Sequence, residues 1–207
     1  MGTESQTYSL PVLPFENMVL FPMVAVPLSI QRPATIKAVE AALASENKMI
    51  AVLTRKDAAK ENPQPEDFYE LGTVATIQLI ARFGATEQII VHGMERIVVV
   101  DLIQTHSYLR AQVRPCPVTK THNIETEALQ REVLEHTSQY FALAHPDKMI
   151  KFPPLLSTGE DILQLVYPVI KLFQLELDKE QELLAASSDK EVLELFNDHL
   201  YHEIQDL

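Results

Sequence analysis

Apolar residues in the first half of the chain fall in short runs between turn signals, a pattern typical of β-strands. After an apolar run that ends at Ile30, the segments predicted as strands are residues 48–54, 72–83, 88–91, 96–104 and 108–114. One short helix interrupts them. It starts at Pro33, where a first helical turn tolerates proline, and apolar residues from Ile36 to Leu43 repeat at helical spacing.

The run from Leu10 to Ile30 contains a single charged residue, Glu16, and four prolines, Pro11, Pro14, Pro22 and Pro27. A membrane-spanning helix needs about 20 apolar residues with closed backbone hydrogen bonds, which interior prolines break. No basic residue precedes the run, so it does not match a secretory signal either. The pattern therefore predicts short strands in a buried core, with proline at strand ends or edges.

The connections between the strands favour a small closed sheet. Residues 55–68 form a polar, proline-bearing loop, residues 84–87 a hairpin turn, and Gly93 is expected to break the next run. Six or seven short strands around one helix indicate a closed or half-closed β-barrel, which hides its edges. A parallel βαβ fold would need regular helices between the strands, and the pattern does not contain them.

The second half has a helical period. Residues 124–144 form one predicted helix, and Ser157-x-x-Glu160 is a capping box for a second, which Pro168 bends or ends. Asp178 is expected to cap a short helix that ends near Ala186. The fold class is thus α+β, with a β-rich domain over residues 1–117 and a helical bundle over residues 118–207.

Ser188-x-x-Glu191 is another capping box, which opens the last predicted helix. The apolar spacing of that helix still continues at Leu207, without a Gly or Pro to end it. We therefore expect that the last helix is truncated within a longer one. The alternative is a natural C-terminal helix that frays.

The net charge of −12 is uneven, with −2 in residues 1–117 and −10 in residues 118–207. An acidic surface repels phosphate, so neither nucleic acid nor an anionic membrane is an expected partner. The single cysteine, Cys116, excludes an internal disulfide and a zinc site built from thiolates. It is interpreted as an inert loop thiol, and the chain fits a reducing compartment such as the cytoplasm.

No sequence motif for catalysis or cofactor binding is found. The five glycines form neither a phosphate-binding loop nor a dinucleotide fingerprint, and there is no nucleophile elbow. His199-x-x-His202 could share a cation on one helix face, which leaves a small metal-binding protein as one hypothesis. A solvated acidic helix explains both histidines more simply, so the predicted catalytic and metal residues are none.

The order L-P-V-L-P-F-E-N-M-V-L-F-P…V-P-L over residues 10–28 resembles the start of the amino-terminal domain of Lon proteases, also called the LON substrate-binding domain. The resemblance continues through R-P-A-T-I-K-A-V-E-A-A-L, M-I-A-V-L-T and the V-x-G-x-x-R step at Val91–Arg96. It implies a PUA-like barrel followed by a helical subdomain. One departure is Met23, where the family often has glycine, and we expect that a methionine there does not take a positive φ and that the turn differs.

The resemblance implies that the chain is the substrate-recognition and hexamer-supporting region of an ATP-dependent serine protease. ATP, Mg²⁺ and peptide hydrolysis would then belong to ATPase and Ser–Lys peptidase modules further along, and this chain would hold no cofactor and catalyse nothing itself. The expected partners are unfolded or damaged proteins and other subunits of the hexamer. A free-standing, non-enzymatic LON-domain adaptor is the alternative.

Recognition of unfolded chains requires exposed apolar surface, and methionine suits it because its side chain is flexible and polarizable. The tentative substrate-binding residues, which gather near predicted strand ends, are Met18, Phe21, Met23 and Met94. We hypothesise that some of them form an exposed patch at one rim of the barrel; the alternative is that all four are core. Gly93, as a turn or bulge, and Arg96 are interpreted as structural.

Overall fold

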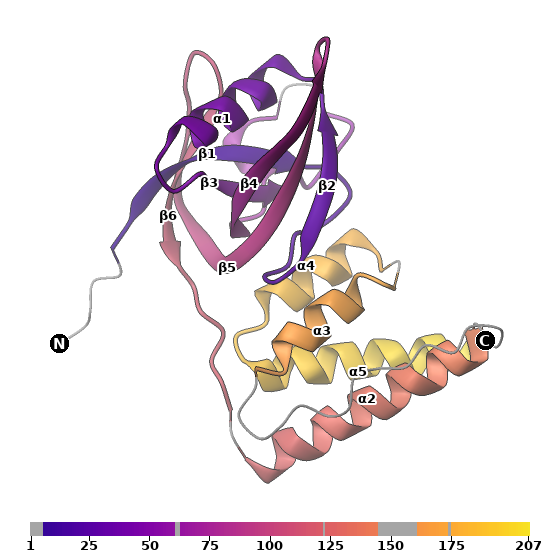
Figure 1. The fold of residues 1–207 in the computed structure, drawn as a ribbon. Helices are drawn as coiled ribbons and strands as arrows, with labels where there is room; N and C mark the ends of the chain where they lie inside the picture. Colours follow the sequence, from indigo (N-terminus) through magenta and orange to yellow (C-terminus); the bar gives the residue numbers. More distant parts are fainter. Residues whose placement is uncertain (1–5, 61–62, 122, 145–160, 174) are drawn as a thin grey trace. The chain divides into compact units, whose positions relative to one another are not determined.

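The computed structural model describes residues 6–60, 63–121, 123–144, 161–173 and 175–207 (Figure 1). The strands are β1 (Tyr8–Phe15), β2 (Ala25–Ile30), β3 (Met49–Thr54), β4 (Leu71–Phe83), β5 (Thr86–Gln104) and β6 (Leu109–Pro115). The helices are α1 (Pro33–Ala44), α2 (Ile124–Ala144), α3 (Leu163–Ile170), α4 (Leu177–Ala185) and α5 (Asp189–Gln205), with a 3-10 turn at Pro65–Asp67.

The chain forms two compact units, which are described separately. The sheet unit contains residues 1–117 together with Glu176–Leu184, and the helical unit contains residues 118–175 and 185–207. The division expected from the sequence assigned all of residues 118–207 to the helical part. It did not anticipate that most of α4 belongs with the sheet.

The sheet unit is built on one mixed sheet that closes on itself. The strand order is β2-β5-β4-β3-β1-β6, and an additional pairing between β5 and β6 completes a ring. The β1–β3 pair is parallel, whereas the other pairs are antiparallel. The α+β class is therefore confirmed, and the ring explains how a short-stranded sheet hides most of its edges.

Three of the four prolines of the opening run, Pro11, Pro14 and Pro27, lie in strand stretches that pair on one side. Residues 8–11 of β1 pair with β6, and residues 12–15 pair with β3, so Pro11 and Pro14 each stand on a stretch with one recorded neighbour. Pro27 lies in β2, which ends the strand order. On a stretch with one neighbour, every second backbone N–H points away from the partner strand, and proline is tolerated at such positions.

Strand β5 runs without interruption from Thr86 to Gln104, so the expected break at Gly93 is wrong. Three register shifts in its pairings skip one residue each, at Ile80, Met94 and Val100. Such β-bulges bend the strand and increase its twist, which lets β5 pair with three different strands. All three bulged residues are large, apolar and 46–57% exposed.

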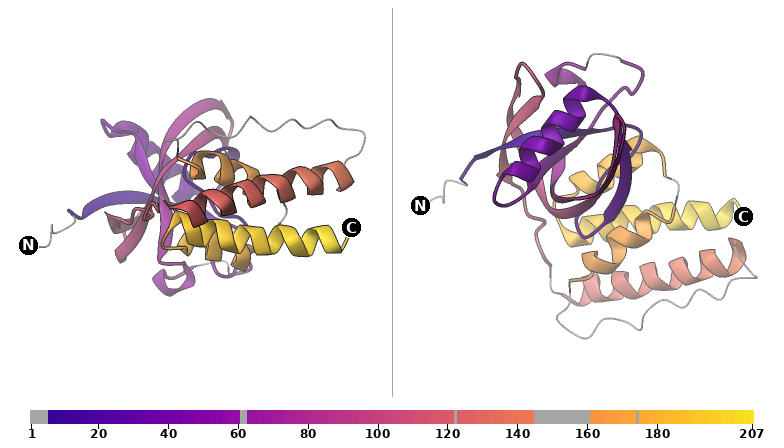
Figure 2. Two further views of the ribbon diagram at one scale, coloured as in Figure 1. Left: turned by 90° about the horizontal axis from the view of Figure 1, so that it is seen from below. Right: turned by 45° about the horizontal axis from the view of Figure 1, so that its top comes forward.

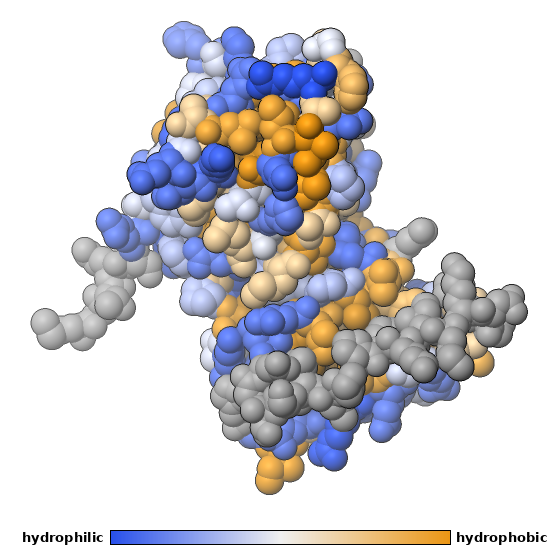
Figure 3. Space-filling view, viewed as in Figure 1, coloured by the Kyte–Doolittle hydropathy of each residue, from blue (hydrophilic) through white to orange (hydrophobic). Residues whose placement is uncertain are grey.

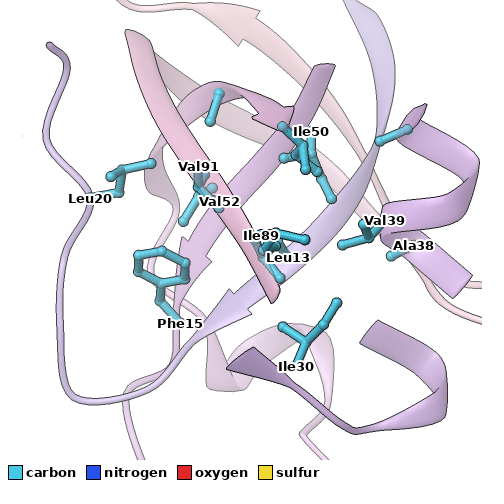
Figure 4. Close-up of a cluster of buried hydrophobic side chains, with 13 residues drawn as sticks. Leu13, Phe15, Leu20, Ile30, Ala38, Val39, Ile50, Val52, Ile89 and Val91 are labelled. Atoms are coloured by element: carbon cyan, nitrogen blue, oxygen red, sulfur yellow. The ribbon is translucent and has the colours of Figure 1, made fainter. Parts of the chain in front are cut away.

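The core of the sheet unit has two apolar clusters. In the first, α1 presents Ala38, Val39 and Ala42 to the sheet, and Figure 4 shows the first two facing the apolar side chains of the strands. The second cluster contains the other faces of β1 and β3 and the inward residues of β6. Each fully buried aliphatic side chain contributes about 1.5–3 kcal/mol relative to an exposed one. Helix α1 crosses in front of the sheet in the second view of Figure 2.

Helix α4 is attached to the sheet unit by hydrogen bonds from three of its residues. The Glu180 carboxylate accepts the backbone N–H of Val19 at 2.9 Å, and this contact is buried. The Gln181 side chain donates to the Leu71 carbonyl at 3.0 Å. The Leu184 carbonyl, near the C-terminal end of α4, accepts from Arg96 at 2.9 Å. Residues about 160 positions apart in the chain thus complete one unit.

In the helical unit, α2 and α5 lie side by side (Figures 1 and 2). An aromatic cluster of Tyr140, Phe141, Phe173 and Phe196 packs with ring centroids 4.6–5.5 Å apart. Ser188 caps α5 by accepting the Glu191 N–H at 3.1 Å, as expected. The Glu191 carboxylate accepts from the backbone and hydroxyl of Ser187, one residue before the expected partner.

Three further expectations for the helical segments have mixed outcomes. Pro168 lies inside α3, which continues to Ile170. Asp178 is within α4 and does not cap it. The Ser157 capping box lies outside the described residues. None of the helices in the described ranges has the length and hydropathy required to span a bilayer.

Candidate functional site

A groove opens on the sheet unit at the N-terminal end of α1. It consists of two adjoining cavities of about 510 and 780 Å³. Both cavities are lined by Pro14, Arg32, Thr35 and Pro63, so these residues mark the junction. Most of the remaining wall of the first cavity is apolar and includes Met18, Leu28 and Ile30.

The parallel pairing of β1 with β3 explains why two charged residues meet in the wall of the groove. The C-terminal ends of parallel strands lie at the same edge of a sheet. Glu16 directly follows β1 and Arg55 directly follows β3, and the Arg55 N–H donates to the Phe15 carbonyl at 2.9 Å. The strand ends therefore place the carboxylate of Glu16 against the guanidinium of Arg55.

Glu16 bridges two arginines of different exposure. Its Oε1 lies 2.5 Å from Nη1 of Arg55, whose side chain is 0% exposed, and 3.1 Å from Nη2 of Arg32, which is 58% exposed. The Arg55 guanidinium also donates to the Lys60 carbonyl. A buried guanidinium is costly without such partners, so we assign Glu16 a large part in holding Arg55. The three side chains together carry a net charge of +1.

A second surface lies where the Phe21–Val24 turn meets β5. The Met23 N–H donates to the Gly93 carbonyl at 3.0 Å, and the Gly93 N–H donates to the Val24 carbonyl at 2.9 Å. A β-carbon at Gly93 would lie 2.3 Å from the Phe21 carbonyl oxygen, so only glycine fits this close approach.

The backbone of Met23 has a φ of +65°, so the expectation that this methionine avoids a positive φ is wrong. Proline at position 22 followed by a positive φ is the pattern of a type II turn. The hydrogen bonds to Gly93 hold the turn although the residue is not glycine. The local strain of such a residue is about 1 kcal/mol or more.

Residues 9–202 match the family model described as the ATP-dependent protease La (LON) substrate-binding domain. The chain belongs to this family. It is 38% identical over 195 residues to the Lon protease of Nitrosococcus oceani, covering 94% of this chain and 25% of that protein. It is 30% identical over 204 residues to Lon protease 2 of Bdellovibrio bacteriovorus, covering 95% and 25%. The chain thus spans about a quarter of the length of these curated relatives.

Two solved structures share the fold of this LON substrate-binding domain. The N terminal domain of Mycobacterium avium complex Lon protease aligns with a TM-score of 0.63 and 17% identity, covering 96% of this chain and 99% of that one. The Lon N-terminal domain protein from Xanthomonas campestris aligns with a TM-score of 0.57 and 14% identity, covering 87% and 92%. At this identity the likeness concerns the fold alone.

Within this LON substrate-binding domain, the four residues proposed from the sequence for substrate contact do not form one patch. Phe21 is fully buried and offers no surface to a partner. Met18 is half-buried, packs against the core and lines the groove. Met23 and Met94 are 51% and 46% exposed, and the Met23 N–H donates to Gly93, the residue before Met94. The exposed-patch hypothesis therefore remains a prediction for Met23 and Met94 alone.

The two residues interpreted as structural lie close to the second surface. Gly93 is next to the bulge at Met94. Arg96 is buried, and its partners include three backbone carbonyls, those of Cys116, Pro117 and Leu184. The planar guanidinium can serve several acceptors at once, so Arg96 ties the exit of β6 to the C-terminal end of α4.

The sequence reasoning missed the Glu16–Arg32–Arg55 cluster. The signal available was Glu16, the single charge in a long apolar run, together with the parallel pairing that only the structure reveals. His199 and His202, considered for a metal, both lie on α5. In the ranges that the structure describes, no group of three or more potential metal ligands comes together.

Proposed function

We propose that this chain binds unfolded or damaged proteins as the substrate-recognition region of a Lon-type, ATP-dependent serine protease. The observation that carries the proposal is the family match over residues 9–202. The relatives are named Lon proteases, and the part of them that resembles this chain covers about a quarter of their length. ATP and Mg²⁺ binding and peptide hydrolysis would then belong to other parts of such a protein, and this region would help to hold its hexamer together.

The surface proposed for first contact is the pair Met23 and Met94. Both side chains are exposed, and the backbone beside them is held by two hydrogen bonds of Gly93. The flexible apolar side chains are thus attached to a fixed backbone. Apolar side chains are also exposed elsewhere on this unit, for example those of Ile80 and Phe83. Figure 3 shows hydrophobic surface, in orange, on the part of the molecule that holds α1 and the sheet. Contacts of this kind depend on apolar area and not on a particular sequence, which suits varied unfolded substrates.

The test is the affinity of the chain for a labelled protein kept unfolded by reduction and carboxymethylation. In the Met23→Asp, Met94→Asp double variant we expect binding at least about fivefold weaker, because two charged groups replace apolar contacts. Aspartate tolerates a positive φ better than most residues, so the turn at position 23 is preserved. The matched control is Val100→Asp with Ile103→Asp, which charges two similarly exposed apolar residues of β5.

Failure to bind the unfolded protein at all would contradict the proposed function. Equal weakening in the control variant would contradict the assignment to Met23 and Met94 and leave a general apolar effect.

We also propose a cytoplasmic location, which the single cysteine supports.

A further inference from the structure

Arg32 lies where the two cavities of the groove meet, and some of its N–H donors are not used by Glu16. It lines both cavities and is the residue before α1. Within the described part of the chain, its guanidinium contacts Glu16 through Nη2, at 3.1 Å. A guanidinium has five N–H donors in a planar arrangement, so the N–H groups on Nε and Nη1 remain available to acceptors such as a carboxylate.

The backbone next to Arg32 adds further donors. The first recorded hydrogen bond of α1 runs from the Ile36 N–H to the Arg32 carbonyl. No side chain caps this helix start, and its first turn contains no acidic residue. Ala34 and Thr35 also line the groove. Their backbone N–H groups belong to the first turn of α1, where N–H groups lack acceptors within the helix and form the positive end of the helix dipole.

Arg55 is the independent sign that an anionic group belongs here. It lines the first cavity, its side chain is completely buried, and its Nε has no hydrogen-bond partner among the described residues. Buried donors are normally satisfied, so an unpaired one next to a cavity indicates a missing acceptor. This local positive charge lies in a chain whose net charge is −12.

We propose that the groove binds the carboxylate of an Asp or Glu side chain within an extended segment of a protein substrate. This inference rests on the proposed function. The carboxylate would lie against Arg32 and the start of α1, and the apolar walls would take the neighbouring side chains. Because Arg32 lines both cavities, the segment continues on both sides of the charge, which fits an internal residue better than a chain terminus.

The test uses seven-residue, fluorescently labelled peptides with blocked ends and a central residue between apolar ones. We expect the peptide with central Glu to bind about tenfold more tightly than the one with central Gln, as for a charge-assisted hydrogen bond. Arg32→Gln should remove this preference and leave the affinity for the Gln peptide unchanged. The matched control is Arg114→Gln, which removes one exposed positive charge from β6.

A third peptide, with central Gln and a free terminal carboxylate, distinguishes the source of the charge. Tighter binding of this peptide than of the Glu peptide would overturn the proposal of an internal side chain. Equal affinity for the Glu and Gln peptides, with intact binding of the unfolded protein, would overturn the carboxylate site alone. Loss of binding to every peptide and to the unfolded protein would contradict the proposed function as well.

Discussion

The carbonyl oxygen of Phe21 lies 2.3 Å from the position that a β-carbon on Gly93 would take. This contact fixes the Phe21–Val24 turn against β5. Because the obstacle is backbone and not a flexible side chain, the turn has to move to accommodate any larger residue.

We expect Gly93→Ala to lower the free energy of unfolding by about 2 kcal/mol, as for overpacking of a well-packed site. Urea unfolding followed by circular dichroism measures this. The comparison variant is Gly84→Ala, at a φ of +61° with open space around it, which should cost about 1 kcal/mol from backbone strain alone. A Gly93→Ala variant as stable as the parent would contradict the close approach.

Met23→Gly is expected to stabilise the chain by about 0.5–1 kcal/mol. Glycine adopts a φ of +65° without strain, and the hydrogen bond from its N–H to Gly93 is retained. The same urea experiment measures the gain. A loss of stability would show instead that the methionine side chain contributes more through packing than its backbone costs.

Glu16→Gln should destabilise the chain by about 1–2 kcal/mol, because the buried Arg55 guanidinium loses its charged partner. The estimate is below that for a fully buried pair because Glu16 is partly exposed. Arg32→Gln breaks only the exposed arm of the cluster and should change stability by no more than about 0.5 kcal/mol. Equal effects of the two variants would refute the assigned difference between the arms.

The loop that contains Asp67 should become less stable in acid. The Lys60 ammonium and the Gln64 N–H both donate to the Asp67 carboxylate, and they hold the pKa of Asp67 below its ordinary value of 3.8. A lowered folded-state pKa stabilises the loop above the unfolded value, and this contribution is lost as the pH falls through the folded pKa. Carbon-13 NMR of the Asp67 carboxylate should give a midpoint below 3.8, which moves upward in Lys60→Met.

Much of the fold follows from local patterns in the sequence. Residues 49–54 are a short, almost continuous apolar run between turn signals and form β3, and the Ser188 cap opens α5 as expected. These features depend on the side-chain period and on one hydrogen bond close in sequence. The same applies to α1, which starts at Pro33 because proline is tolerated in the first turn of a helix.

The missed features depend on contacts between distant segments. In the sequence, Gly93 looks like the end of a strand. Its actual role is to allow the close approach of Phe21, which is 72 positions away and so leaves no local signal. Each bulge skips one residue of the strand pairing, at Ile80, Met94 and Val100, and the position of such a skip depends on the partner strand. The Glu16–Arg55 pair needed the parallel β1–β3 register, which the sequence does not state.

The membership of α4 in the sheet unit affects how the protein is made on the ribosome. The carboxylate that satisfies the Val19 N–H belongs to Glu180, and the carbonyl that receives Arg96 belongs to Leu184. When Pro117 leaves the exit tunnel, all six strands are available, yet these late partners have not been synthesised. At typical translation rates of about 5–20 residues per second, the newly made sheet waits on the order of several seconds for its final helix. During that interval the Val19 N–H has not yet met the carboxylate that accepts it in the finished fold.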